Sequence, residues 1–182
     1  MVSSPEPVTS LPRTETPEIN DQNRALWDAL AGVADPEIPA VSVVDMGMIR
    51  SADVDEDGRA DVVVLPTFTG CPAIDIIKGD VARAIEQVPG VESAAVSTSF
   101  DPPWTTDRIT NEGRKKLNDF GLAPPTGDGP VLVTSIGLPT IAVCPFCGGR
   151  DTKNENAFGP TPCRALYYCN TCRNPFEQFK PV

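Results

Sequence analysis

The chain of 182 residues is 40% hydrophobic, enough for one ordinary domain or for one domain with a small satellite. Its formal net charge of −10 argues against a nucleic-acid partner, because binding to a phosphate backbone depends on Lys and Arg. It contains no histidine, which excludes His-based general bases, Ser–His and Cys–His pairs and His-ligated metals. Any metal must therefore be held by thiolates or carboxylates.

The sequence also indicates where the protein resides. No apolar run approaches the roughly 20 residues that a membrane-spanning helix needs. The first segment lacks the cationic start and apolar core of a secretory signal. We therefore expect a cytoplasmic protein, in which clustered cysteines indicate metal ligands before disulfides.

The first part of the chain predicts a tail, a helix and a hairpin. Residues 1–19 are rich in Pro, Ser, Thr and Glu and have few large apolar groups, so we expect a disordered tail. A helical pattern begins at Asp21 and ends before Asp35-Pro36-Glu37, since the residue before a proline disfavours the α region. Two β-rich runs, about 48–54 and 60–65, then flank a turn-forming DEDG sequence.

The next elements complete a first domain over residues 20–122. An apolar stripe predicts a helix over 73–88, because Ile74, Ile77, Val81 and Ile85 recur at helical spacing. Residues 91–100 favour a third strand, and 110–120 a short polar helix. The order α-β-β-α-β-α predicts an α+β fold with a small three-stranded sheet covered on one face.

The rest of the chain predicts a second, smaller unit. The sequence APPTGDGP, residues 123–130, is typical of a linker between domains. Residues 131–182 begin with β-type sequence, carry five cysteines and end in a further strand. We expect a β-rich zinc ribbon here.

Four of these cysteines have the spacing of a metal site. CPFCGG at 144–149 and CNTC at 169–172 each form a C-x2-C pair, and two such pairs complete a tetrahedral S4 site. We predict one structural zinc ion per chain, held by Cys144, Cys147, Cys169 and Cys172. Two disulfides, or an iron centre in the same cage, are the alternatives. Four cysteines leave no open position for substrate, so this zinc would not be catalytic.

The two remaining cysteines leave alternatives open. Cys163 pairs with no neighbour in a C-x2-C unit, so it is a buried thiol, an alternative ligand or a second redox or metal-transfer thiol. Cys71 precedes Pro72 at a predicted helix N-terminus, where the helix dipole favours thiolate and lowers the pKa. A core thiol is the other interpretation of Cys71, and its approach to Cys163 across the two domains is a third.

Two further residues have competing interpretations. Asp45, in the sequence DMG, either fixes a turn or serves as a second ligand beside Cys71. Trp104, in FDPPW, is either a core side chain or an exposed docking anchor.

Several longer runs carry a family resemblance. DPEIPAVSVVDMGMI, PTFTGCP, PGVESAAV and FDPPWTTDRITNEGRKKL resemble the domain of SufT and of the cytosolic iron–sulfur assembly factors. With GLAPP, the CPFCGG…CNTC ribbon and PFEQFK, the chain from Asp21 to its end resembles the PaaD (PaaJ) family of phenylacetyl-CoA epoxidase accessory proteins.

The resemblance implies a non-catalytic role in aerobic phenylacetate degradation. The protein's partners would be a multicomponent oxygenase and the iron–sulfur flavoprotein reductase of that oxygenase. The resemblance leaves open whether the protein forms a homodimer. Cys71 takes the position of the family's reactive cysteine, with Asp45 in the adjoining DMG turn, so a transient iron or iron–sulfur cluster is implied there. The leading hypothesis is maturation of the epoxidase complex by iron or cluster delivery. The alternative is a zinc-ribbon adaptor that holds the complex together without metal transfer.

Overall fold

The computed structural model describes residues 17–125 and 141–180 of the chain. Most of the predicted tail (1–19), most of the predicted linker (123–130) and the first ten residues of the predicted ribbon (131–182) lie outside these ranges. Within the described residues, no helix combines the length and the apolar character needed to cross a bilayer.

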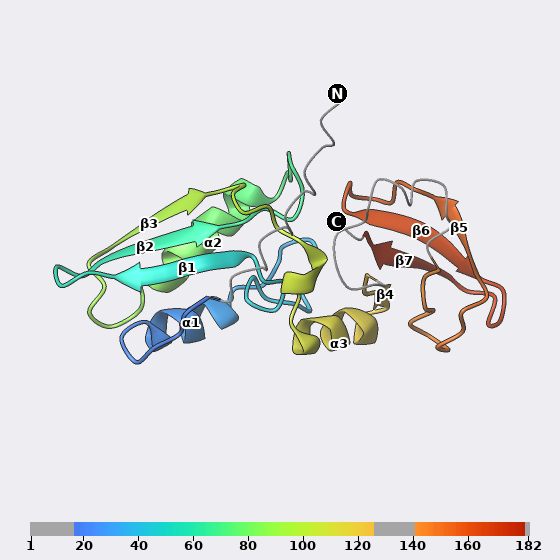
Figure 1. Cartoon of the computed structure of the whole chain (residues 1–182), viewed down its shortest axis with the longest axis horizontal. Helices are drawn as coiled ribbons and strands as arrows, with labels where there is room; N and C mark the ends of the chain where they lie inside the picture. Colours follow the sequence, from blue (N-terminus) through green and yellow to red (C-terminus); the bar gives the residue numbers. More distant parts are fainter. Residues whose placement is uncertain (1–16, 126–140, 181–182) are drawn as a thin grey trace, which may run out of the picture.

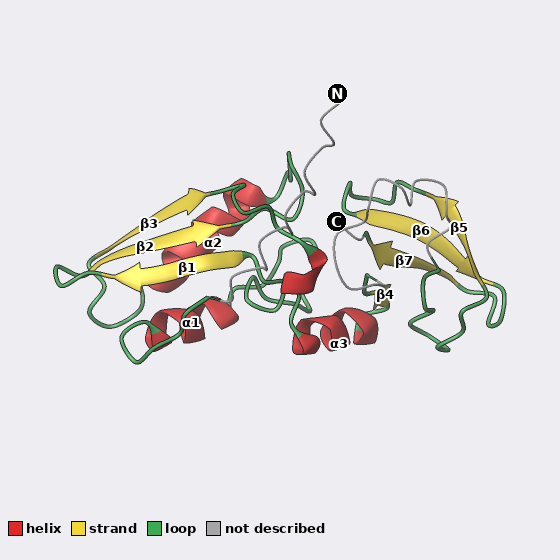
Figure 2. Cartoon of the chain, in the orientation of Figure 1, coloured by secondary structure: helices red, strands yellow, loops and turns green. Residues whose placement is uncertain are grey.

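The first domain has the predicted order of elements (Figures 1 and 2). Each boundary lies within a few residues of the predicted one. The elements are α1 (Arg24–Ala31), β1 (Ile49–Val54), β2 (Arg59–Val64), α2 (Ile74–Ile85), β3 (Ser93–Thr98), the 3-10 turn Thr106–Arg108 and α3 (Asn111–Asp119).

The first sheet has the strand order β1-β2-β3, antiparallel between β1 and β2 and parallel between β2 and β3. The parallel pair is joined through α2, as parallel neighbours require a crossover. Along β2, Ala60, Val62 and Val64 are buried, whereas Asp61 between them is exposed. One face of the sheet therefore carries the core, as predicted, and the other face is open.

The hairpin between β1 and β2 forms at the predicted turn. The Asp55 carboxylate accepts hydrogen bonds from the amides of Asp57 and Arg59, and Gly58 has φ of +76°. Glycine is favoured there because a side chain makes this left-handed conformation costly. The DEDG sequence is thus a hairpin tip.

The second sheet has the order β4-β7-β6-β5 and lies beside the first, with α3 and the 3-10 turn between them (Figure 1). Its strands are β4 (Leu122–Ala123), β5 (Thr152–Asn156), β6 (Arg164–Cys169) and β7 (Pro175–Phe179). β4 pairs in parallel with β7, which was not predicted. Ala123, expected in the linker, is therefore a strand residue, and the end of the first domain contributes an edge to the ribbon sheet.

Two cores stabilise the molecule, and Trp104 lies where its two parts meet. The larger core lies on the covered face of the first sheet and includes Phe179 of β7. The ribbon's core is much smaller and includes two of the paired cysteines, Cys144 and Cys169. Trp104 is 5% exposed, donates from Nε1 to the Met46 carbonyl (2.8 Å) and meets Phe179 edge to face at 5.8 Å. It is a core side chain and not an exposed anchor.

Candidate functional site

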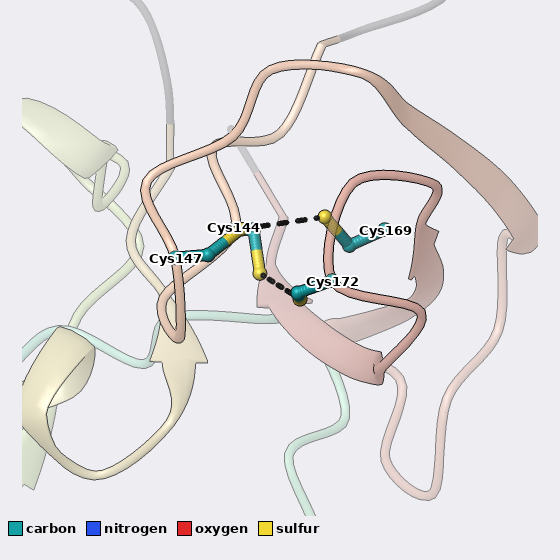
Figure 3. Close-up of side chains that lie close together, drawn as sticks. All are labelled: Cys144, Cys147, Cys169 and Cys172. Atoms are coloured by element: carbon teal, nitrogen blue, oxygen red, sulfur yellow. Dashed lines mark hydrogen bonds between the residues drawn. The ribbon is translucent and has the colours of Figure 1, made fainter.

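The four ribbon cysteines lie on two tight turns of the same design. In the first, the Gly148 amide donates to the Cys144 carbonyl (2.8 Å), and Gly148 has φ of +70°. In the second, the Arg173 amide donates in the same way to the Cys169 carbonyl (2.8 Å), and Arg173 has φ of +62°. Each turn points its two sulfurs at the other turn (Figure 3).

The sulfur geometry fits a tetrahedral metal. The four Sγ atoms lie within 4.8 Å of one another, with Cys144 and Cys172 3.7 Å apart and Cys147 and Cys169 3.6 Å apart. Zinc–sulfur bonds of about 2.3 Å at tetrahedral angles separate two sulfurs by about 3.8 Å, whereas a disulfide requires about 2.05 Å. All four cysteines are free thiols. The donor set therefore fits a structural zinc ion and not two disulfides.

Cys71 lies in the loop between β2 and α2, just before the helix. Its amide donates to the Phe68 carbonyl (3.1 Å), and its own carbonyl accepts from the Ile74 amide (3.3 Å). The side chain is half-buried against the larger core. The sequence correctly predicted this position at the N-terminal end of α2.

The predicted electrostatics of Cys71 are wrong. Burial raises the pKa of the Cys71 thiol above its usual value, although a hydrogen bond from the Ala73 amide lowers it. The negative charges of Glu37 and Asp35 raise it further. The helix N-terminus does favour thiolate, but its effect is smaller than that of burial. Cys71 is therefore a neutral thiol at neutral pH when nothing is bound to it.

Cys163 is half-buried directly before β6, and it shares a crevice with Cys71. Its sulfur lies 3.1 Å from the Thr161 hydroxyl. Burial raises the pKa of the Cys163 thiol, as it does for Cys71. Cys163 is not part of the four-sulfur cluster. One interpretation left open by the sequence was that Cys71 and Cys163 approach one another. The structure places both thiols in the same crevice.

Asp45 lies elsewhere, in a hydrogen-bond network of its own. Its carboxylate accepts from the Ser42 amide (2.8 Å) and from Lys116 Nζ (2.8 Å). Burial acts to raise the pKa of the Asp45 carboxyl, but the bonds from Lys116 and Ser42 outweigh it and lower that pKa from 3.8. Asp45 is not among the residues that line the crevice beside Cys71. The geometry gives it a role in fixing the turn, and a role beside Cys71 stays a prediction.

Two acidic residues of the crevice were missed by sequence reasoning. Asp35 and Glu37 line it together with Cys71 and Cys163. Both belong to the sequence that was interpreted only as a helix stop. Nothing in their spacing from either cysteine indicates the contact, which arises when the loop after α1 packs beside the loop before α2.

Comparisons with known proteins agree with both halves of the structure. Residues 23–98 match the family described as "Iron-sulfur cluster assembly protein", and residues 129–180 match the "PaaD zinc beta ribbon domain". An Escherichia coli K12 protein, named as one subunit of a "Putative 1,2-phenylacetyl-CoA epoxidase", is 36% identical over 162 residues, covering 88% of this chain and 94% of that protein.

Two further proteins each match about half of the chain. The "Fe-S protein maturation auxiliary factor" of Porphyromonas gingivalis is 40% identical over 88 residues, which are 48% of this chain and 83% of that protein. The crystal structure of a DUF59 domain from Bacillus anthracis is 30% identical with a TM-score of 0.49, covering 53% of this chain and 90% of that one.

Proposed function

Since this chain belongs to the PaaD family of phenylacetyl-CoA epoxidase subunits, we propose that it is a non-catalytic accessory protein that delivers iron or an iron–sulfur cluster to that enzyme complex. The clients would be the oxygenase component and its iron–sulfur flavoprotein reductase, in the cytoplasm. The relatives of the first domain are named as maturation factors, which supports the assignment of a maturation role.

The observation that carries the proposal is the position of Cys71. It is a free thiol at the edge of the domain that matches the iron–sulfur assembly family, outside the four-cysteine cluster. Thiolates are the protein ligands that iron–sulfur chemistry uses, and an edge position allows a cargo to be passed on. A half-buried thiol of raised pKa stays protonated until a metal displaces the proton, which suits transient holding.

The ribbon serves a structural purpose in this proposal. Cys144, Cys147, Cys169 and Cys172 would hold one zinc ion, which supplies folding energy to a unit with a small core. Four thiolate ligands leave no position for a substrate or a water nucleophile. The zinc therefore stabilises the ribbon and carries out no chemical step.

The test is to produce the epoxidase components with no accessory chain, with the wild-type chain, with Cys71→Ser or with Thr69→Ser. Thr69→Ser changes an exposed neighbour in the same loop and serves as the matched control. We expect the iron and acid-labile sulfide of the purified components to fall without the chain and with Cys71→Ser, and to stay at the wild-type level with Thr69→Ser.

The adaptor alternative makes a different prediction in the same experiment. If the chain only holds the complex together, Cys71→Ser leaves the iron and sulfide of every component unchanged. Loss of the ribbon by Cys169→Ser would then dissociate the components without changing the metal content of each. That pair of results would replace metal delivery with an adaptor role.

A further inference from the structure

We infer that Cys71 and Cys163, one from each part of the molecule, form a single binding site for one thiophilic divalent metal ion. The inference rests on the proposed function only for the identity of the natural ion, Fe²⁺. The inference adds Cys163 of the ribbon as a second protein ligand beside Cys71. It also limits the cargo held between these two thiols to a single ion.

The two thiols line one narrow crevice between the two parts. Cys71, Phe68 and Glu37 contribute from the first domain, and Cys163, Pro162 and Phe179 from the ribbon. The crevice is partly open and has a volume of about 10 Å³. A space of that size holds about one water molecule, so a single ion fits and a cluster of several iron and sulfur atoms does not.

Backbone contacts fix both thiols where they are. Cys71 is held by the hydrogen bonds of its loop to Phe68 and Ile74. The Cys163 carbonyl accepts from the Lys180 amide (2.9 Å), which attaches it to the end of β7. Both thiols therefore belong to segments whose backbone is held by hydrogen bonds.

Arg164, next to Cys163, joins the ribbon to the other wall of the crevice. One guanidinium nitrogen donates to the Glu37 carbonyl (2.6 Å), and another donates to the Glu177 carboxylate (3.0 Å). A charge-assisted contact of this kind is shorter and stronger than a neutral one. It holds Cys163 beside the loop that carries Glu37.

Two carboxylates at the crevice favour a cation, and the Arg164 guanidinium beside Cys163 opposes them in part. Glu37 and Asp35 both line it, and Asp35 already caps its loop by accepting from the Glu37 amide (2.8 Å). Their negative charge disfavours two adjacent thiolates without a metal and favours a divalent ion once it enters. Uptake would release thiol protons as the metal binds.

The site is separate from the ribbon's zinc cage. Cys163 directly precedes β6, whereas the zinc ligand Cys169 ends that strand. Six residues of extended strand span about 20 Å, so the two sites share no ligand. β6 connects the two sites along the chain, since the folded ribbon places Cys163 in the crevice that Cys71 also lines.

The test measures Fe²⁺ binding to the full-length, zinc-loaded chain by anaerobic equilibrium dialysis without sulfide, with the thiolate-to-iron absorbance as a second readout. We expect the wild type to retain one Fe²⁺ per chain in addition to zinc. Cys71→Ser and Cys163→Ser should each weaken binding at least about 10-fold, and the double variant should resemble the weaker single variant. Glu37→Gln should weaken it less, and Glu92→Gln, an exposed carboxylate outside the crevice, should match the wild type.

Three results would overturn the inference. If only Cys71→Ser loses iron, the ribbon thiol is not a ligand, and the proposed function stands without it. If the wild type retains iron only in a parallel dialysis that contains sulfide, and with an equal amount of sulfide, the cargo is a cluster and not a single ion. If all variants bind as the wild type does, neither thiol holds metal. Each variant must retain one zinc per chain, and Cys163→Ala replaces any Cys163→Ser protein that does not.

Discussion

Asp45 and Met46 act as the anchor for the segment that follows the first sheet. The Asp45 carbonyl accepts from the Thr110 amide (2.9 Å), and its carboxylate accepts from Lys116 (2.8 Å). The Met46 carbonyl accepts from Trp104 (2.8 Å). The DMG turn therefore has the structural role that was one of the two interpretations of Asp45. Its three partners were not predicted, because they lie far along the chain.

Asp45→Asn tests this anchor by removing a carboxylate that is only 8% exposed. We expect unfolding free energy to fall by about 1–2 kcal/mol at pH 7, since the charge-assisted bond from a half-exposed Lys116 is lost. Chemical denaturation measures this loss, and Asp53→Asn, an exposed carboxylate on the open sheet face, should stay within about 0.5 kcal/mol of wild type.

The same carboxylate predicts a pH dependence. The folded pKa of Asp45 lies below 3.8, so the contribution is present above that value and is lost as pH falls through the folded pKa. The stability difference between wild type and Asp45→Asn should therefore shrink at acidic pH. A difference that stays constant down to acidic pH would show that Asp45 acts through packing and not through its charge.

At the scale of elements, α2 and α3 each contain a glycine, and the two have opposite surroundings. A Cβ on Gly79 of α2 would meet nothing within 4 Å. A Cβ on Gly113 of α3 would lie 2.4 Å from the Asp45 carbonyl oxygen, a backbone atom. Gly113 therefore allows α3 to approach the DMG turn. Gly79 lowers the stability of its helix and allows no close approach in exchange.

Alanine at each position should change stability in opposite directions. Gly79→Ala should raise the unfolding free energy by about 0.5–1 kcal/mol, because alanine loses less backbone entropy in a helix. Gly113→Ala should lower it by about 1–3 kcal/mol, because α3 must move away from the turn. Denaturant melts of both proteins measure the two effects, and a stabilised Gly113→Ala would contradict the close approach.

At the scale of the whole molecule, the two sheets depend on one another through Trp104 and Phe179. Phe179 belongs to β7 of the ribbon but packs in the larger core, where it meets the Trp104 ring. The ribbon has only a small core, so we expect its fold to depend on its metal, whereas the first domain has an extensive core of its own. Loss of the metal should therefore uncover Trp104 before the first domain unfolds.

A chelator provides the test, in a Trp27→Phe background that leaves Trp104 as the one remaining tryptophan. Zinc removal should shift the Trp104 fluorescence to longer wavelength, while the helical circular dichroism of α1–α3 is largely retained. Zinc added back should reverse the shift. If the emission wavelength of Trp104 stays unchanged after zinc removal, the ribbon remains packed against Trp104 without the metal.

The order of the elements and the four zinc ligands could be predicted because each depends on short-range pattern. The stripe from Ile74 to Ile85 needs only helical periodicity, and a C-x2-C pair needs only one turn to bring two sulfurs together. The family resemblance further indicated that Cys71 takes the position of the family's reactive cysteine. Local geometry already determines these features, so neighbouring residues contain the information.

The tertiary structure alone decided the features that join distant segments. The two-residue strand β4 is too short for a sequence pattern, and it exists because β7 offers an edge. The pKa of Cys71 follows burial and the charges of Asp35 and Glu37, which outweigh the helix effect that sequence suggests. The meeting of Cys71 and Cys163 likewise depends on how two separately folded surfaces pack, and no local pattern specifies that.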